Sequence, residues 1–196
     1  EEDSDFTTSS NTTNNQSTRT IAAGYDIGGG ANIEVAYFNF EQSMKIKKRF
    51  KTFDYIFARN VLAHVPNPNK IFIGVKNLLN KNGKFILEVP HLDNIIRYNQ
   101  YDNIFHEHIG FHSLKSIIDL SNKHNLKVFD VEKIESQGGS IRCFICNLSS
   151  SEKISNKIKS VVNEEKKLGL YSSIKLKKFK LKIQSNIKKI QILLEN

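Results

Sequence analysis

Two short apolar runs, Phe53-Asp-Tyr-Ile-Phe-Ala58 and Lys84-Phe-Ile-Leu-Glu-Val89, decide the fold of this chain. The first is rich in aromatic and β-branched residues, which is typical of a strand that is buried on both faces. Between the two runs, residues 69–79 carry apolar side chains at helical spacing, and Asn82-Gly83 is a typical helix end. A strand, a helix and a strand with short links predict a right-handed parallel crossover, and therefore an α/β fold.

The sequence after this crossover predicts another helix and two further strands. Ser113 is a typical N-cap for a helix that runs to about His124. The strands are expected at residues 126–134 and 140–148, with Gly138-Gly139 in the loop between them. Because no helix separates these strands, we expect an antiparallel pair at the edge of a sheet that is otherwise mostly parallel.

The chain of 196 residues divides into three expected parts. Residues 1–30 begin with a long run of Ser, Thr, Asn, Gln and acidic residues, which cannot bury enough apolar surface to offset the entropy of ordering. We expect this segment to be poorly ordered, although residues 21–30 are also compatible with a short strand and a glycine turn. Residues 31–150 form the expected sheet domain, including a basic helix at 41–50, and residues 151–196 a Lys-rich helical tail.

The positive charge of the chain is concentrated in this tail. The formal net charge is +9, and residues 151–196 hold twelve Lys and four Glu, a net charge of +8. A nucleic-acid surface more often mixes Arg with aromatic residues, and the tail has no Arg. We therefore favour solvated Lys-rich helix faces over nucleic-acid binding. The tail also carries an apolar stripe that needs a partner surface: Leu176, Phe179, Ile183, Ile187, Ile190 and Leu194.

Cysteine usage and hydropathy favour a cytoplasmic protein. Cys143 and Cys146 are three residues apart in a predicted strand, which places their side chains on opposite faces and disfavours a disulfide. No apolar run approaches the ~20 residues that a membrane helix needs. The acidic, polar N-terminus is neither a signal peptide nor a transit peptide. We expect a cytoplasmic monomer without a membrane segment.

A first polar cluster, Asn60-Val-Leu-Ala-His64, follows the first strand directly. Ligands of open α/β sheets bind beyond the carboxyl ends of the strands, where this cluster falls. A helical turn would place Asn60 and His64 on one face, because they are four residues apart. The alternative is structural: Asn60 caps the turn, and His64 is a surface histidine.

A second polar cluster is Phe105-His-Glu-His108. A carboxylate beside two imidazoles offers groups that titrate near neutrality and influence one another's titration. A metal site is an alternative, because two histidines two residues apart share a face in an extended strand. Zinc needs further ligands at a defined spacing, which the sequence does not show, so no metal is expected. The candidate metal ligands are His106 and His108, with His64, His91 and His112 as the other histidines available. A plain surface cluster of histidines remains a further interpretation.

In their order along the chain, these segments resemble the NDP-sugar (deoxysugar) C-methyltransferases. Residues 53–66 are similar to the family's signature after its fourth strand, and residues 83–90 to its fifth strand, which ends in Glu-Val-Pro. Residues 105–108 resemble its Tyr-His-Glu-His segment, and residues 137–142 its turn between the last two strands. The sequence from Phe179 onward fits its linking helix. The resemblance covers residues 35 to about 190.

This resemblance implies a Rossmann-like class I methyltransferase sheet and an enzyme that uses S-adenosylmethionine. The family removes a proton beside the ketone of a nucleotide-linked keto-deoxysugar and methylates the enolate. Position by position, it implies that His108 is the base, that Glu107 assists it, and that Asn60 and His64 line the site. The implied cofactor-binding residues are Gly28, Gly30, Ala58 and Asn60. The implied substrate-binding residues are Phe105, Glu88, Ser140 and Arg142.

The sequence departs from the family at three points. Phe105 stands where the family has Tyr, so a phenol hydroxyl is missing. Only 27 residues lie between Asp26 and Asp54, too few for the usual strands and helices after the glycine turn. We also expect the family's zinc-binding region and its C-terminal α/β domain to be absent. A non-catalytic remnant or interaction module with an incomplete cofactor site is therefore the alternative hypothesis.

Overall fold

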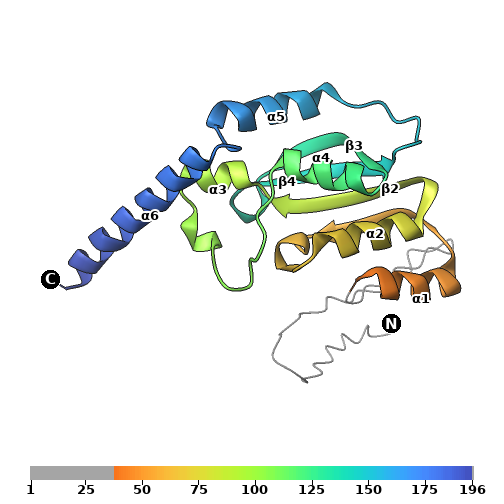
Figure 1. Cartoon of the computed structure of the whole chain (residues 1–196), viewed down its shortest axis with the longest axis horizontal. Coiled ribbons are helices and arrows are strands. Elements are labelled where there is room, and N and C mark those ends of the chain that lie inside the picture. Colours follow the sequence, from red (N-terminus) through yellow and green to blue (C-terminus); the bar gives the residue numbers. More distant parts are fainter. Residues whose placement is uncertain (1–37, 196) are drawn as a thin grey trace, which may run out of the picture.

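The computed structural model describes residues 38–195, which form a four-stranded sheet with helices. The strands are β1 (Phe53–Arg59), β2 (Leu79–Pro90), β3 (Leu126–Ile134) and β4 (Ser140–Asn147), and their spatial order is β1-β2-β4-β3. β1 pairs with β2 in parallel, whereas β4 is antiparallel to both β2 and β3 (Figure 1). The α/β class and the antiparallel pair at the edge are confirmed. Among the described strands, one pairing is parallel and two are antiparallel, so the expectation of a mostly parallel sheet is wrong for this part of the chain.

The helices confirm most of the predicted pattern. They are α1 (Phe40–Phe50), α2 (Pro68–Leu78), α3 (Leu92–Tyr98), α4 (Leu114–Lys123), α5 (Asn156–Leu168) and α6 (Ser173–Leu194). Three short 3-10 turns accompany them: η1 (Leu62–His64), η2 (Tyr101–Asn103) and η3 (Ser136–Gly138). Ser113 caps α4 as predicted and forms a capping box with Ser116. The sequence analysis did not predict α3.

The predicted helix end at Asn82-Gly83 is wrong, because both residues lie within β2. The helix ends at Leu78, and Leu79 already pairs with Phe53 of β1. The register then shifts between this pair and the next. A Cβ on Gly83 would lie 2.8 Å from the carbonyl oxygen of Phe53. Gly83 therefore permits a close backbone approach in the irregular first part of the strand pair.

Helices cover one face of the sheet, and the hydrophobic core lies beneath them (Figure 1). Phe72 of α2 meets Phe85 of β2 edge to face, with ring centroids 5.7 Å apart. α4 and α5 add apolar side chains to the same core. The opposite face of β1 carries Tyr55 and Phe57, which are 60% and 68% exposed, so the prediction of a strand buried on both faces is wrong within residues 38–195. The sheet is thus covered on one side only among the described residues.

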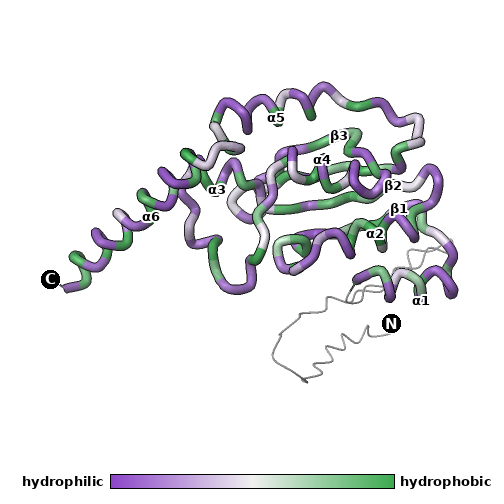
Figure 2. Tube along the Cα trace, in the orientation of Figure 1, coloured by the Kyte–Doolittle hydropathy of each residue, from purple (hydrophilic) through white to green (hydrophobic). Residues whose placement is uncertain are grey.

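The tail contains two helices that differ in burial. α5 packs against the domain through Ile158 and Val161, and Gly169 ends it in the left-handed conformation, with φ of 77°. α6 has no buried residue, so the apolar stripe predicted to need a partner surface is not covered by the described part of the chain (Figure 2). Within residues 38–195, no helix has the length and apolar character needed to cross a membrane.

Both cysteines are free thiols, as the spacing predicted. Cys143 belongs to the core cluster, and burial raises the pKa of its thiol. Cys146 is also buried, three residues further along β4. Residues 1–30, predicted to be poorly ordered, lie outside the described residues.

Candidate active site

Asn60 marks the point where β1 ends and the candidate site begins. Its backbone has a φ of 53°, a left-handed conformation that Asn tolerates better than most residues. Its N–H donates to the carbonyl of Glu88 at 2.9 Å. The predicted helical turn from Asn60 is wrong, because η1 begins only at Leu62. The side-chain Oδ1 of Asn60 is buried and has no hydrogen-bond partner among the described residues, so it can accept a hydrogen bond from a ligand.

His64 and His108 lie against each other at the carboxyl end of β1, although they are far apart in the sequence. Glu107, which directly precedes His108, comes 43 positions after His64. Their ring centroids are 4.8 Å apart. The Nδ1 of His64 lies 2.9 Å from the carbonyl oxygen of Glu107, and the Nδ1 of His108 lies 2.8 Å from that of Asn103. Because a carbonyl only accepts, each Nδ1 must donate. In the neutral rings this leaves the lone pair on Nε2, the atom that can act as a base.

The segment that carries His108 is a turn held against η1. The N–H of His108 donates to the carbonyl of Phe105 at 2.9 Å. The N–H groups of Ile109 and Gly110 both donate to the carbonyl of Ala63, at 2.9 and 3.0 Å. Backbone hydrogen bonds therefore join the two polar clusters that the sequence showed separately.

The extended strand considered for His106 and His108 is not present. The side chain of His106 is 88% exposed, whereas His108 is partly buried. No group of three or more His, Cys, Asp or Glu side chains suited to a metal ion occurs within residues 38–195. The imidazoles of His106 and His108 therefore lie in different environments.

Aromatic rings surround the His108 imidazole. The centroid of Phe105 lies 4.2 Å from that of His108, and Phe111 meets the imidazole edge to face at 6.0 Å. Phe105 is itself 43% exposed, so it stands at the rim of the site. Packing against two rings and one hydrogen bond fixes the orientation of His108.

Nearby, burial lowers the pKa of His112 and outweighs a hydrogen bond to the Leu62 backbone, so this imidazole is neutral at pH 7.

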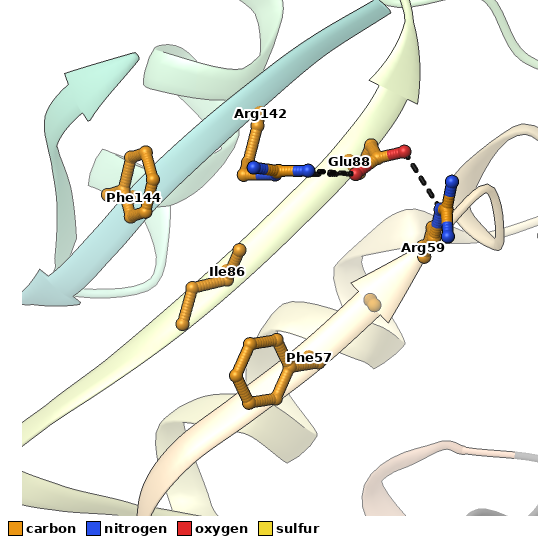
Figure 3. Close-up of a pocket in the computed structure, with 7 residues that line it drawn as sticks. Phe57, Arg59, Ile86, Glu88, Arg142 and Phe144 are labelled. Atoms are coloured by element: carbon orange, nitrogen blue, oxygen red, sulfur yellow. Dashed lines mark hydrogen bonds and ion pairs between the residues drawn. The ribbon is translucent and has the colours of Figure 1, made fainter. Parts of the chain in front are cut away.

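Glu88 lies on the uncovered face of the sheet, between two arginines (Figure 3). Its Oε1 accepts from the Nε of Arg59 at 2.9 Å, and its Oε2 lies 3.2 Å from Nη2 of Arg142. The carboxylate is almost fully buried, whereas the Arg59 side chain is 70% exposed. Glu88 therefore positions the two guanidinium groups. Arg59 was not predicted, and its only signal in the sequence is its place at the end of the first strand.

These arginines border a shallow depression of about 350 Å³. Its lining comes from three neighbouring strands: Phe57, Ala58, Arg59, Ile86, Glu88, Arg142 and Phe144. Figure 3 shows the two Phe side chains and Ile86 on the same side of the sheet as the arginines. The depression combines apolar walls with guanidinium groups, which suits a ligand with a flat ring and a negative charge.

The other predicted site residues differ in their surroundings. Ser140 is 1% exposed, and its hydroxyl donates to the carbonyl of Ser136 at 2.8 Å. Ala58 pairs with Leu87 and packs against the core. Gly28 and Gly30 lie outside the described residues. The side chain of Glu107 is one-third exposed, and its backbone carbonyl accepts from His64.

A family model and a known protein both match this chain. Residues 13–131 match the family model described as a methyltransferase domain. C-methyltransferase NovU of Streptomyces niveus is 33% identical over 135 residues, which cover 69% of this chain and 32% of NovU. The chain thus spans about a third of the length of that relative.

Solved structures of low identity are also similar to part of the chain. A SAM-dependent methyltransferase from Anabaena variabilis ATCC 29413 is 14% identical, with a TM-score of 0.44 over 56% of this chain and 55% of that one. Magnesium protoporphyrin IX methyltransferase from Synechocystis PCC 6803 is 12% identical, with a TM-score of 0.39 over 49% of this chain and 45% of that one.

Proposed function

Because the chain belongs to the methyltransferase-domain family, we propose that it serves the S-adenosylmethionine-dependent C-methylation of a keto-deoxysugar nucleotide. The family match agrees with the resemblance that the four sequence motifs indicated. The relative of 33% identity is named a C-methyltransferase, which supports a carbon as the methyl acceptor. The proposal also includes a cytoplasmic monomer that acts on a nucleotide-linked sugar and not on nucleic acid or a membrane.

The imidazole pair is the observation that carries this proposal. The Nε2 of His108 takes a proton from the carbon beside the sugar ketone, and the C–H electron pair forms the enolate. The carbonyl of Asn103 holds the opposite Nδ1–H and stabilises the imidazolium that results. The ring centroid of His64 lies 4.8 Å from that of His108, and in this proposal the protonated His64 ring donates a hydrogen bond to the substrate. In this proposal Glu107 assists His108, which directly follows it in the turn, and its backbone carbonyl accepts from His64.

One structural observation supports a cofactor site at the end of β1. The buried Oδ1 of Asn60 has no hydrogen-bond partner within residues 38–195, and a ligand donor such as an amino or hydroxyl group would satisfy it. Ala58, Gly28 and Gly30 complete the proposed cofactor-binding set. S-adenosylmethionine supplies an electrophilic methyl group when bound. Phe105, Glu88, Ser140 and Arg142 form the proposed substrate-binding set, with Glu88 acting through the arginines.

Two separate measurements test the proposal on the chain itself. Proton abstraction is followed by NMR as deuterium uptake beside the ketone of a 4-keto-deoxysugar nucleotide in D₂O, and it needs no cofactor. Cofactor binding is measured by isothermal titration with S-adenosylmethionine. We expect both deuterium uptake and binding heat. Absence of uptake at saturating sugar nucleotide would remove the proposed role of His108.

The alternative is a methyltransferase-like remnant or interaction module without catalysis. Phe105 in place of Tyr and the short spacing between Asp26 and Asp54 favour it. This alternative predicts no heat with millimolar S-adenosylmethionine and no deuterium uptake. Uptake without binding heat would instead assign the base to this chain and refute its cofactor site.

Changing Phe105 to Tyr is expected to accelerate deuterium uptake by about 10- to 100-fold, because a phenol donor beside His108 stabilises the enolate oxygen. The rate is measured by NMR at saturating substrate. Phe111→Tyr is the matched control, since it adds the same hydroxyl to the other ring that contacts His108. An equal gain in both variants, or a gain in neither, would contradict a specific role for position 105.

A further inference from the structure

The segment between α3 and α4 carries His108, and hydrogen bonds rather than burial hold its first part in place. Residues 99–113 loop out from the sheet before the chain returns to α4 (Figure 1). Within the described part of the chain, no residue of the 3-10 turn η2 is buried. Its last residue, Asn103, supplies the carbonyl oxygen that lies 2.8 Å from Nδ1 of His108. Because η2 has no buried side chain, its hydrogen bonds must place this carbonyl.

Gln100 stands at the start of η2 and anchors it in two ways. Its backbone carbonyl accepts from the N–H of Asn103 at 3.3 Å, which closes the turn. Its side-chain Nε2 donates to the carbonyl of Gly138 at 2.8 Å. Gly138 belongs to η3, the turn between β3 and β4, 38 residues further along the chain. Gln100 therefore ties the position of the Asn103 carbonyl to the sheet.

The turn that accepts from Gln100 is closely packed against α3. Gly138 and Gly139 have φ values of 74° and 109°, which favour glycine. The carbonyl of Gly139 accepts from the N–H of His91, the N-cap of α3, at 3.1 Å. A Cβ on Gly139 would lie 1.7 Å from Nδ2 of Asn94 in α3, so only glycine permits this approach. The turn thus holds the start of α3 and, through Gln100, the chain just beyond its end.

We propose that Gln100 is a positioning residue for His108 and that the Gly138-Gly139 turn is the support from which it acts. The inference rests on the proposed function, in which Nε2 of His108 takes the proton. The Gln100 side chain fixes η2, and the carbonyl of Asn103 then accepts from Nδ1–H of His108. This keeps the lone pair of the neutral ring on Nε2 and fixes the direction of the ring.

Three substitutions of Gln100 and one control test this link. Gln100→Glu keeps the length of the side chain but replaces the N–H donor by a carboxylate oxygen, which repels the Gly138 carbonyl. Gln100→Met removes the donor without adding charge, and Gln100→Lys retains a side-chain N–H donor. The Oε1 of Gln100 has no hydrogen-bond partner within residues 38–195, so its removal breaks no other bond. Gln137→Glu is the matched control, because it adds the same charge to an exposed side chain of the same turn.

The first readout is the tautomer of the His108 ring, which needs no substrate. It is measured by ¹⁵N NMR of the full chain at a pH where the ring is neutral, and the signal is identified by its absence in His108→Asn. We expect protonation at Nδ1 in the wild type and a mixture of both tautomers in Gln100→Glu and Gln100→Met. Gln100→Lys and Gln137→Glu should keep the wild-type tautomer.

The second readout is deuterium uptake beside the ketone of the 4-keto-deoxysugar nucleotide. Gln100→Glu and Gln100→Met should lower kcat by about 3- to 10-fold, the effect of losing one neutral hydrogen bond, with KM changed less than about 2-fold. Circular dichroism verifies that each variant is folded. A purely structural role would lower the stability to urea and leave the tautomer and kcat unchanged, which would overturn the proposal.

Other outcomes would also contradict the role of Gln100. They are a wild-type ring without a proton on Nδ1, an equal change in Gln137→Glu, and a loss in Gln100→Lys as large as that in Gln100→Met. A rise in KM at constant kcat would instead make Gln100 a substrate contact and overturn its positioning role. Absence of uptake by the wild type would refute the proposed base, and the tautomer of His108 would still decide whether Gln100 positions the ring.

Discussion

His108→Asn is expected to lower deuterium uptake beside the sugar ketone by about 10²- to 10⁴-fold, the range that a positioned general base contributes. Asn is the informative replacement, because its Nδ2–H₂ can still donate to the carbonyl of Asn103, as the imidazole Nδ1 does. The substitution removes only Nε2, the nitrogen with the available lone pair. The expected loss therefore reports on proton abstraction and not on the fold of the turn.

The control for this experiment is His106→Asn, two residues away. The side chain of His106 is 88% exposed and contributes nothing to the imidazole pair, so the rate is expected to stay within about 2-fold of the wild type. His64→Asn should lower the uptake rate less than His108→Asn, because in the proposed mechanism His64 orients the substrate and does not take the proton. Equal activity of His108→Asn and wild type would show that the base lies elsewhere.

Elements with strong local signals were predictable from the sequence. The aromatic run of β1, the helical spacing of α2 and the Ser113 cap each act within a few residues, and each is present in the structure. The antiparallel pairing of β3 and β4 followed from the short loop between them. In such elements local propensity and the global fold agree.

Features set by distant contacts were not predictable. Asn60 adopts a left-handed φ while its N–H is bonded to Glu88 on the neighbouring strand, so its conformation depends on strand pairing. The turn that carries His108 is held by the carbonyl of Ala63, more than forty residues earlier. A sequence pattern of period 2 or 3.6 contains no information about such contacts. For this reason the closeness of His64 and His108, whose ring centroids lie 4.8 Å apart, was expected from the family resemblance and not from their spacing.

The hydrogen-bond network around Glu165 is a second feature that could not be predicted from the sequence. Glu165 falls among apolar residues on one side of α5 and is fully buried. Its Oε1 lies 2.7 Å from Nε2 of His91 and accepts from the N–H of Leu114 at 2.5 Å, and its Oε2 accepts from the N–H of Lys115 at 3.2 Å. The carboxylate thus binds the N-terminus of α4, where the helix dipole favours a negative charge. It joins the tail to the sheet domain.

Burial alone would raise the pKa of Glu165, but the hydrogen bonds from His91, Tyr171 and the Leu114 backbone outweigh it and hold the pKa below its ordinary value of 4.5. A carboxyl with a lowered pKa in the folded state stabilises the fold above the unfolded pKa, and this stabilisation is lost as the pH falls through the folded pKa. The contribution of Glu165 should therefore be complete at pH 7 and should decline below about pH 4.5.

Glu165→Ala is expected to lower the free energy of unfolding by about 3 to 5 kcal/mol at pH 7, because it leaves the buried His91 imidazole and the buried N–H of Leu114 without their acceptor. Urea denaturation followed by circular dichroism measures the change. Glu164→Ala is the matched control: its partner Lys133 is half exposed, and the loss of this surface pair should cost no more than about 1 kcal/mol. The difference between wild type and Glu165→Ala should shrink below pH 4.5, as the wild-type carboxylate becomes protonated. A difference that stays constant down to the acid transition would mean that Glu165 acts through packing, and that its charge contributes nothing to joining α5 to α4.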